Sequence, residues 1–271
     1  MAPVITLLTD FGVESTYPAQ MKGVILERQP RAVIVDMSHG VPRHDVHTAA
    51  FMLASAAPAF PSGTVHVAVV DPEVGSQRRV LAAAADGHLY LAPDNGLLTL
   101  VAQRQFLFGA AVAPARVVAV EDETFYRADV SSTFHGRDIF APLAAALASG
   151  TPIETLGSQV ESVERFDVPL PQRADDTIHG QVLYVDPFGN LVTNIAGEML
   201  TAAQWADAEV HMTGAVIRGL CRAYCEVAAG MLLAYVGSAG LLEVAVNRQS
   251  AAVRLGAGIG TALSVGLPPA P

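Results

Sequence analysis

The sequence contains little cysteine and no long apolar run. Its two cysteines, Cys221 and Cys225, are too few for a disulfide framework and match no common zinc spacing, so we expect a reducing, cytoplasmic setting. No uninterrupted apolar stretch reaches the roughly 18 residues that a membrane helix needs. The first residues, MAPVITLLTD, place no basic residue before their apolar run, which argues against a signal peptide. These absences predict a protein without a membrane partner.

Basic residues are also scarce. The chain has 16 Lys and Arg against 26 Asp and Glu, a formal net charge of -10 at pH 7. Without a basic patch, nucleic acid is excluded as the main partner. With 51% hydrophobic and 15% charged residues over 271 positions, the chain can bury a large core in one large domain or two modest ones.

Motifs for phosphate-bearing cofactors are absent. Neither GxGxxG nor GxxxxGKS occurs, so we expect no nucleotide cofactor. A histidine cluster, His39, His44 and His47, does permit a shared metal, because His44 and His47 are three residues apart at a predicted helix start. Asp45 can cap that helix instead, and HExxH is absent, so we predict no metal site. A metal-dependent hydrolase stays an alternative.

The first half of the chain repeats one pattern. Five apolar runs rich in Val and Ile each end on a carboxylate, at Asp10, Asp36, Asp71, Asp94 and Asp122. Helical patterns lie between several of them. This alternation predicts an α/β fold, an N-terminal αβα domain with a mostly parallel sheet. Ligands of such sheets bind beyond the carboxyl ends of the strands, where these carboxylates are expected.

The second half has a different pattern. A helix over residues 136–150 closes the first domain, which we place at 1–150, and residues 151–176 are polar and proline-spaced like a linker. Residues 177–271 contain strand pairs around PFGN and GSAG turns, and residues 251–265 are expected to add one or two strands. We therefore predict a small C-terminal antiparallel β-barrel or sandwich.

Three short motifs contain candidate site residues. In VVDPEVGSQRR, Asp71 and Arg78 predict either an ion pair that stabilises the fold or a site that manages charge on a small substrate. Asp10 of TDFG can accept two hydrogen bonds from a ribose diol. His135 precedes a predicted helix, whose N-terminal dipole favours neutral imidazole, while Asp138 suits a helix cap.

The PFGN turn offers a stacking face and an amide. Phe188 and Asn190 can recognise the ring and the edge of adenine without any charge. The alternative is an ordinary hairpin turn.

Six ordered motifs together resemble the S-adenosylmethionine (SAM) hydroxide adenosyltransferases, relatives of the bacterial fluorinase and chlorinase. The motifs are TDFG, VVDPEVGSQRR, APDNGLL, STFHGRDIFAP, YVDPFGNLVTNI and GSAGLLEVAVN, and the resemblance extends from Thr6 to Leu255. It implies an αβα N-terminal domain and a β-barrel C-terminal domain. It also implies a homotrimer in which the substrate lies between the N-terminal domain of one subunit and the C-terminal domain of the next.

The resemblance further implies a reaction. The hydroxide-using branch carries an Asp–Arg–His triad, which maps onto Asp71, Arg78 and His135, whereas halogenases lack it. The implied enzyme is a SAM hydrolase that forms adenosine and L-methionine and needs no cofactor. A SAM-dependent halogenase and a non-catalytic nucleoside-binding trimer remain alternatives.

The same resemblance assigns the substrate contacts. Asp10 would hold the ribose hydroxyls, Phe188 and Asn190 the adenine, and Asp186 and Ser238 the methionine end. Two positions depart from the family pattern: Ser15 stands where relatives often have Asp, and Glu73 replaces a usual Gly. Neither belongs to the triad.

Overall fold

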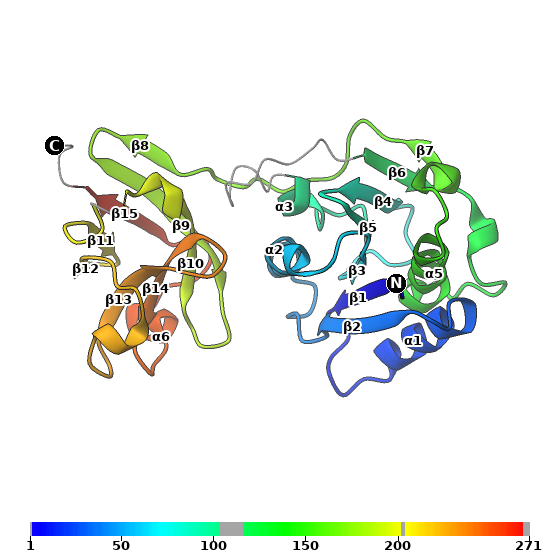
Figure 1. Ribbon diagram of the computed structural model, residues 1–271, viewed down its shortest axis with the longest axis horizontal. Coiled ribbons are helices and arrows are strands. Elements are labelled where there is room, and N and C mark those ends of the chain that lie inside the picture. The colour runs from blue at the N-terminus through cyan, green and yellow to red at the C-terminus, as the bar shows by residue number, and fades with distance from the viewer. Residues whose placement is uncertain (1, 103–115, 202–203, 268–271) are drawn as a thin grey trace. The chain divides into compact units, whose positions relative to one another are not determined.

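The computed structural model describes residues 2–102, 116–201 and 204–267. The chain divides into two compact units, of which the first extends to Phe166 and the second begins at Asp167. Each unit has its own sheet (Figure 1). No helix within the described ranges is long and apolar enough to cross a membrane.

The sheet of the first unit is mixed. Its strands follow the order β2-β1-β3-β5-β4-β6-β7. In chain order they are β1 (Val4–Thr9), β2 (Val33–Ser38), β3 (Val65–Val69), β4 (Val80–Ala85), β5 (His88–Pro93), β6 (Arg116–Val120) and β7 (Gly157–Gln159). β2, β1, β3 and β5 pair in parallel, while β4 pairs antiparallel with β5 and β6. β4 was not predicted from the sequence, because VLAAAA contains a single β-branched residue, Val80, and no aromatic residue, and these are the types that favour strands.

The direction of these strands sets the place of the carboxylates. β6 runs the same way as β5, since both are antiparallel to β4. The strands that precede Asp10, Asp71, Asp94 and Asp122 therefore all end at one edge of the sheet. Asp36 differs, because it lies within β2 rather than at its end.

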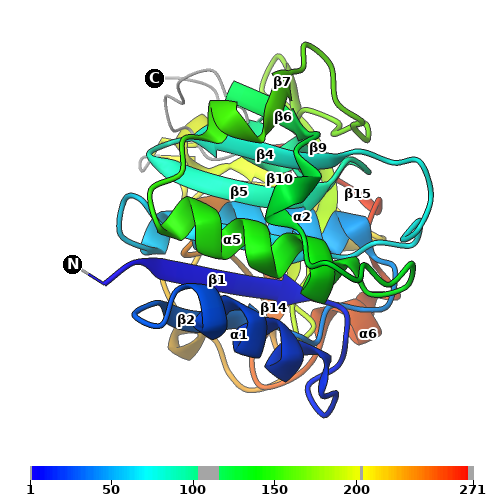
Figure 2. The same cartoon turned by 90° about the vertical axis from the view of Figure 1, so that its right-hand side faces the viewer.

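Helices cover both faces of this sheet. α1 (Tyr17–Arg28) and α5 (Ala141–Ala148) lie on one face, and α2 (Val46–Ala56) and α3 (Thr99–Ala102) on the other (Figures 1 and 2). Asp45 caps α2, accepting from the Thr48 backbone N–H at 2.9 Å. The α/β class and the αβα layering are thus confirmed. Short helices complete the unit: η1 (Ala57–Ala59), η2 (Glu123–Phe125), η3 (Gly136–Phe140) and η4 (Ile153–Leu156).

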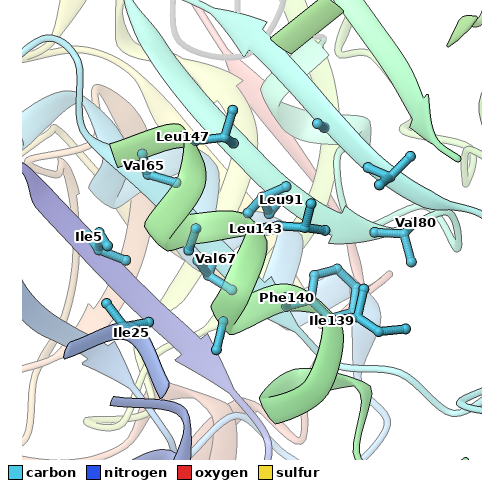
Figure 3. Close-up of a cluster of buried hydrophobic side chains, with 14 of the residues drawn as sticks. Ile5, Ile25, Val65, Val67, Val80, Leu91, Ile139, Phe140, Leu143 and Leu147 are labelled. Carbon is cyan, nitrogen blue, oxygen red and sulfur yellow. The ribbon is translucent and has the colours of Figure 1, made fainter. Parts of the chain in front are cut away.

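The core lies between the sheet and α5. Leu143 and Leu147 of α5 pack with Val67 and Leu91 of the sheet (Figure 3). Phe140, fully buried, lies where η3, a single π-helical turn, joins α5. Each such side chain contributes about 1.5–3 kcal/mol through burial, which fixes α5 and the residues before it against the sheet.

The second unit is an antiparallel, nearly closed barrel, as expected. Its path is β12-β11-β15-β9-β10-β14-β13, with β8 beside β9. The strands are β8 (Gln172–Ala174), β9 (Thr177–Val185), β10 (Leu191–Ala196), β11 (Glu209–Met212), β12 (Ala215–Arg218), β13 (Leu232–Val236), β14 (Leu241–Val246) and β15 (Ala262–Gly266). A bridge between Cys221, just after β12, and Tyr235 of β13 links the two ends of the path.

Two segments differ from the expectation. Residues 251–255 form α6 (Ala251–Leu255) rather than a strand, because Ser250 caps the helix and Gly256 ends it with φ 57°. Residues 151–176, expected as a linker, supply β7 to the first sheet and β8 to the second. Both strands have three residues and are mostly exposed, so no hydrophobic alternation reveals them.

Candidate active site

Asp71, Arg78 and His135 form one connected chain of hydrogen bonds. Asp71 follows β3, and the glycine turn after it brings Arg78 back toward the carboxylate. Arg78 Nε donates to Asp71 Oδ1 at 2.8 Å and Oδ2 at 2.7 Å, and Nη2 also bonds Oδ2. Arg78 Nη2 then lies 2.9 Å from His135 Nδ1. With side chains 3% and 4% exposed, Arg78 and Asp71 are a buried pair.

The arginine determines which nitrogen of His135 carries the proton. A guanidinium group only donates hydrogen bonds, so Nδ1 of His135 is the acceptor. Neutral His135 therefore carries its hydrogen on Nε2. Protonation of Nδ1 would replace the acceptor with a donor and break the bond to Arg78. The arrangement thus favours a neutral imidazole with Nε2–H available as a donor.

The electrostatics of His135 agree with this assignment. Burial lowers the pKa of His135 below its ordinary 6.5, and the positive charge of Arg78 lowers it further. The negative charges of Asp71 and Asp138 act in the opposite direction. The net result is a histidine that stays neutral at physiological pH.

A cavity of about 290 Å³ opens beside this chain. Its wall includes Asp71, His135 and Asp10, so three candidate residues from separate motifs meet at the carboxyl edge of the sheet. Asp10 Oδ2 accepts from the His44 backbone N–H at 2.9 Å. His44 adopts φ 66°, an uncommon conformation outside glycine, and it also lines the cavity.

Aromatic rings that sequence reasoning did not identify line the same cavity. Phe11, Tyr17 and Phe134 contact one another edge to face, with centroid distances of 4.9–5.9 Å. Phe11 and Phe134 lie inside the TDFG and STFHG motifs. Both residues are adjacent in sequence to a candidate site residue, and this adjacency could have identified them.

The remaining candidates lie in the second unit. Asp186 holds the PFGN turn: its Oδ1 accepts from the backbone N–H groups of Phe188 at 2.9 Å and Asn190 at 2.8 Å. Phe188 is 79% exposed, and with Asn190 it lines a cavity of about 410 Å³. Ser238 is exposed in the turn between β13 and β14.

A polar network fixes the amide of Asn190. Its Nδ2 donates to Asp186 Oδ2 at 2.7 Å and to the Tyr224 hydroxyl at 2.9 Å, which uses both hydrogens. The Tyr224 hydroxyl lies 2.6 Å from that of Tyr235, which donates to the buried Glu243. Asn190 can therefore only accept a hydrogen bond from a ligand, through Oδ1, whereas the sequence allowed its amide both to donate and to accept.

The histidine cluster does not converge on one point. His39 is buried, 2.9 Å from Thr9 Oγ1 and 3.0 Å from Asp36 Oδ1. His44 and His47 line a second cavity of the first unit, of about 1020 Å³, and the His47 ring contacts that of Phe166 with the two planes tilted by 43°. Within the described ranges, no three His, Cys, Asp or Glu side chains are grouped to hold a metal ion.

The two departures from the family pattern lie outside the hydrogen-bonded chain. Glu73 is exposed and lines the cavity of about 1020 Å³. Ser15 Oγ accepts from the backbone N–H of Tyr17 at 3.1 Å, at the start of α1.

These features define an α/β unit with an Asp–Arg–His site at the carboxyl ends of its strands, followed by a β-barrel unit. Family models for the SAM hydroxide adenosyltransferase N-terminal and C-terminal domains match residues 5–157 and 180–264. The chain therefore belongs to the SAM hydroxide adenosyltransferase family.

Individual relatives agree with this membership. The chain is 42% identical over 263 residues to the (R)-S-adenosyl-L-methionine hydrolase of Thermus thermophilus, covering 94% of this chain and 96% of that protein. It is 29% identical to the fluorinase of Nocardia brasiliensis, with 97% of each chain covered. A crystal structure of an uncharacterized conserved protein from Thermotoga maritima superposes with a TM-score of 0.87 at 34% identity, covering 97% of this chain and 99% of that one.

Proposed function

We propose that this protein is a SAM hydrolase, in which water displaces the thioether at the 5′ carbon and forms adenosine and L-methionine. The observation that carries the proposal is the hydrogen-bonded chain Asp71–Arg78–His135 at the wall of a cavity. The relatives support it, since the hydrolase of Thermus thermophilus has higher identity to this chain than the fluorinase of Nocardia brasiliensis.

The chemistry requires a better nucleophile rather than a better leaving group. A sulfonium departs as a neutral thioether, so no acid has to protonate it, whereas water is a weak nucleophile. Arg78 supplies positive charge, and His135 Nε2–H donates to the oxygen, so both groups stabilise negative charge on it. The oxygen forms the new bond to the 5′ carbon as the carbon–sulfur bond breaks, and one water proton is released to solvent.

Asp71 has a supporting part in this scheme. Its carboxylate fixes the orientation of the guanidinium and offsets the charge of Arg78, which would otherwise repel the sulfonium. Donors placed in advance around a developing charge are each worth roughly 10²-fold or more in rate. Alignment of water with the carbon–sulfur bond supplies a further part.

The substrate contacts in this proposal follow the family resemblance. Asp10 holds the ribose hydroxyls, and Phe188 and Asn190 hold adenine. Asp186 and Ser238 lie near the methionine end. The family resemblance supports a homotrimer, with the substrate between the first unit of one subunit and the second unit of the next. We place the enzyme in the cytoplasm and expect it to work without a cofactor or metal.

Product analysis tests the proposal. Purified protein is incubated with SAM, with and without fluoride, chloride or bromide, and the products are separated by chromatography with mass detection. Adenosine and methionine formed regardless of halide are expected. A 5′-halo-adenosine would identify a halogenase instead. Loss of turnover after chelation would support a metal-dependent hydrolase, and binding without turnover a nucleoside-binding protein.

A further inference from the structure

Asp138 is a fully buried carboxylate that the proposed reaction does not use. It lies inside η3 and makes no capping bond, contrary to the role expected from the sequence. Arg137 reaches it twice, from Nε to Oδ1 at 2.7 Å and from Nη2 to Oδ2 at 2.9 Å. Arg127 Nη1 adds a third bond to Oδ1, at 3.2 Å. A buried charge of this kind is costly unless each oxygen is satisfied, and here both oxygens accept hydrogen bonds from arginine.

The contacts of Asp138 enclose the segment that carries His135. Its Oδ2 accepts from the backbone N–H of Ser131 at 3.0 Å, four residues before His135. Its own backbone N–H donates to the Phe134 carbonyl at 3.1 Å. Thr133, Phe134 and His135 within this segment line the cavity of about 290 Å³. Asp138 thus binds this cavity-lining segment at two points, through its carboxylate at Ser131 and through its backbone N–H at Phe134.

Arg137 extends the same anchor to neighbouring elements. Its guanidinium lies 4.9 Å from the centroid of the Phe134 ring, and its Nη1 donates to Gln20 of α1 at 3.1 Å. The adjoining Gly136 packs tightly, because a Cβ there would come within 3.3 Å of Phe11 and Met21 atoms. The loop is therefore held between α1 and the start of α5 with little freedom to shift.

We infer that Asp138, clamped by Arg127 and Arg137, is a positioning residue that places His135 Nδ1 against Arg78 at the reaction site. The inference rests on the proposed function for its catalytic consequence, but not for its structural one. A shift of about 1 Å in a reacting group can cost roughly 10²-fold in rate, so a side chain that never touches substrate can control turnover. The negative charge of Asp138 also raises the pKa of His135, against burial and Arg78.

The experiment compares Asp138→Asn with two milder variants and a control. Arg137→Lys and Arg127→Lys keep the positive charges but lose the planar guanidinium, and Asp122→Asn removes another carboxylate of the same unit, the cap of η2. For each protein we would measure kcat and KM for SAM, the adenosine Kd and the thermal unfolding midpoint. The ring signals of His135 would be followed by NMR against pH.

A specific pattern is expected. Asp138→Asn lowers kcat by at least ~10-fold with KM and adenosine Kd changed less than about 3-fold, because a misplaced catalytic group affects the transition state more than the ground state. The His135 signals move, and its pKa falls. Arg137→Lys gives a smaller loss of kcat, and Asp122→Asn gives none.

The results distinguish a failure of the positioning role from a failure of the proposed function. A folded Asp138→Asn protein with unchanged kcat and unchanged His135 signals would overturn the inference. If that variant does not fold, unchanged kcat and His135 signals in Arg137→Lys would overturn it equally. If the parent protein releases no adenosine but the His135 signals still move in Asp138→Asn, the positioning role stands and the proposed function fails.

Discussion

Two histidines of the first unit, His66 and His135, both have a lowered pKa but lie in different surroundings. His66 is fully buried in β3, 2.8 Å from Thr6 Oγ1 and 3.3 Å from His88, and burial lowers its pKa to about 3. His135 is half-buried, bonded to Arg78 and open to a cavity of about 290 Å³. Only the second has both a charged partner and room for a substrate.

The difference shows what a lowered pKa indicates. For His66 the causes are burial and then the neighbouring His88, so no ion pair is involved. For His135 burial is followed by Arg78, while Asp71 opposes both. A perturbed pKa identifies a functional group only together with a cavity and a specific charge partner. His66 is therefore the structural counterpart of His135.

The largest effect on turnover is expected from removing the side chains that stabilise negative charge on the attacking oxygen. Arg78→Ala and His135→Ala should each lower kcat roughly 10²–10³-fold, because the first removes positive charge beside the attacking oxygen and the second removes the hydrogen-bond donor to it. Adenosine affinity should stay within about 3-fold, since neither side chain contacts the nucleoside in the proposed arrangement. Chromatographic assay of adenosine release and calorimetric titration with adenosine check both statements.

The control for this prediction is His66→Ala, which should retain kcat per folded molecule. Arg78→Ala leaves the buried Asp71 without its partner, so unfolding is measured in parallel and Arg78→Lys is included. Normal turnover in both Arg78→Ala and His135→Ala would remove the triad assignment. Equal loss of turnover in His66→Ala would show that the comparison between the two histidines is mistaken.

The second prediction concerns stability. His66→Ala should lower the free energy of unfolding by about 2–4 kcal/mol, because it leaves a cavity in the core and removes the partner of Thr6. His135→Ala should cost less, since its site is already open to solvent on one side. Urea unfolding followed by circular dichroism measures both. A larger loss for His135→Ala would reverse the roles assigned to the two residues.

Much of the fold could be predicted from the sequence, because its strongest signals are local. The five apolar runs that end on Asp correspond to β1, β2, β3, β5 and β6, and the PFGN and GSAG turns lie between paired strands. β4 could not be predicted, because its alanines favour helix and only pairing with β5 and β6 makes it a strand. α6 was predicted as a strand, because its five residues are too few to show a helical periodicity.

The site was less accessible to sequence reasoning. Asp71, Arg78 and His135 were candidates from their motifs, but their grouping as a triad came from the family resemblance. Their hydrogen bonds could not be derived from spacing, since Arg78 and His135 are 57 residues apart. The aromatic rings of Phe11, Tyr17 and Phe134 were missed, because isolated aromatic residues usually indicate core. The anchor on Asp138 was missed because Ser131 and Arg127, which precede it by 7 and 11 residues, become its neighbours only in the folded chain.

The third prediction is the pH dependence of turnover. Active enzyme needs neutral His135, because protonated Nδ1 cannot accept from Arg78. As pH falls through the lowered pKa of His135, kcat should fall up to about tenfold per pH unit, with a midpoint below 6.5. Rates are measured immediately after a pH jump, with recovery at pH 7.5 to detect unfolding. A midpoint above 6.5 would contradict the assigned electrostatics.

The smallest effect is the pH dependence of stability, and it arises at the other histidine. Between its ordinary pKa of 6.5 and its folded pKa of about 3, His66 binds a proton only in the unfolded state. The contribution of His66 to the free energy of unfolding is therefore fully present above pH 6.5. It falls by roughly 1.4 kcal/mol per pH unit as pH decreases through this window. His135 adds a contribution of the same sign, so the test is the difference in slope between the parent protein and His66→Ala. Measuring the free energy of unfolding from pH 6.5 to 5 keeps the titration of most carboxylates out of the comparison. Equal slopes in the two proteins would mean that His66 binds its proton equally in the folded and unfolded states. Burial would then not lower the pKa of His66, and the contrast with His135 would be lost.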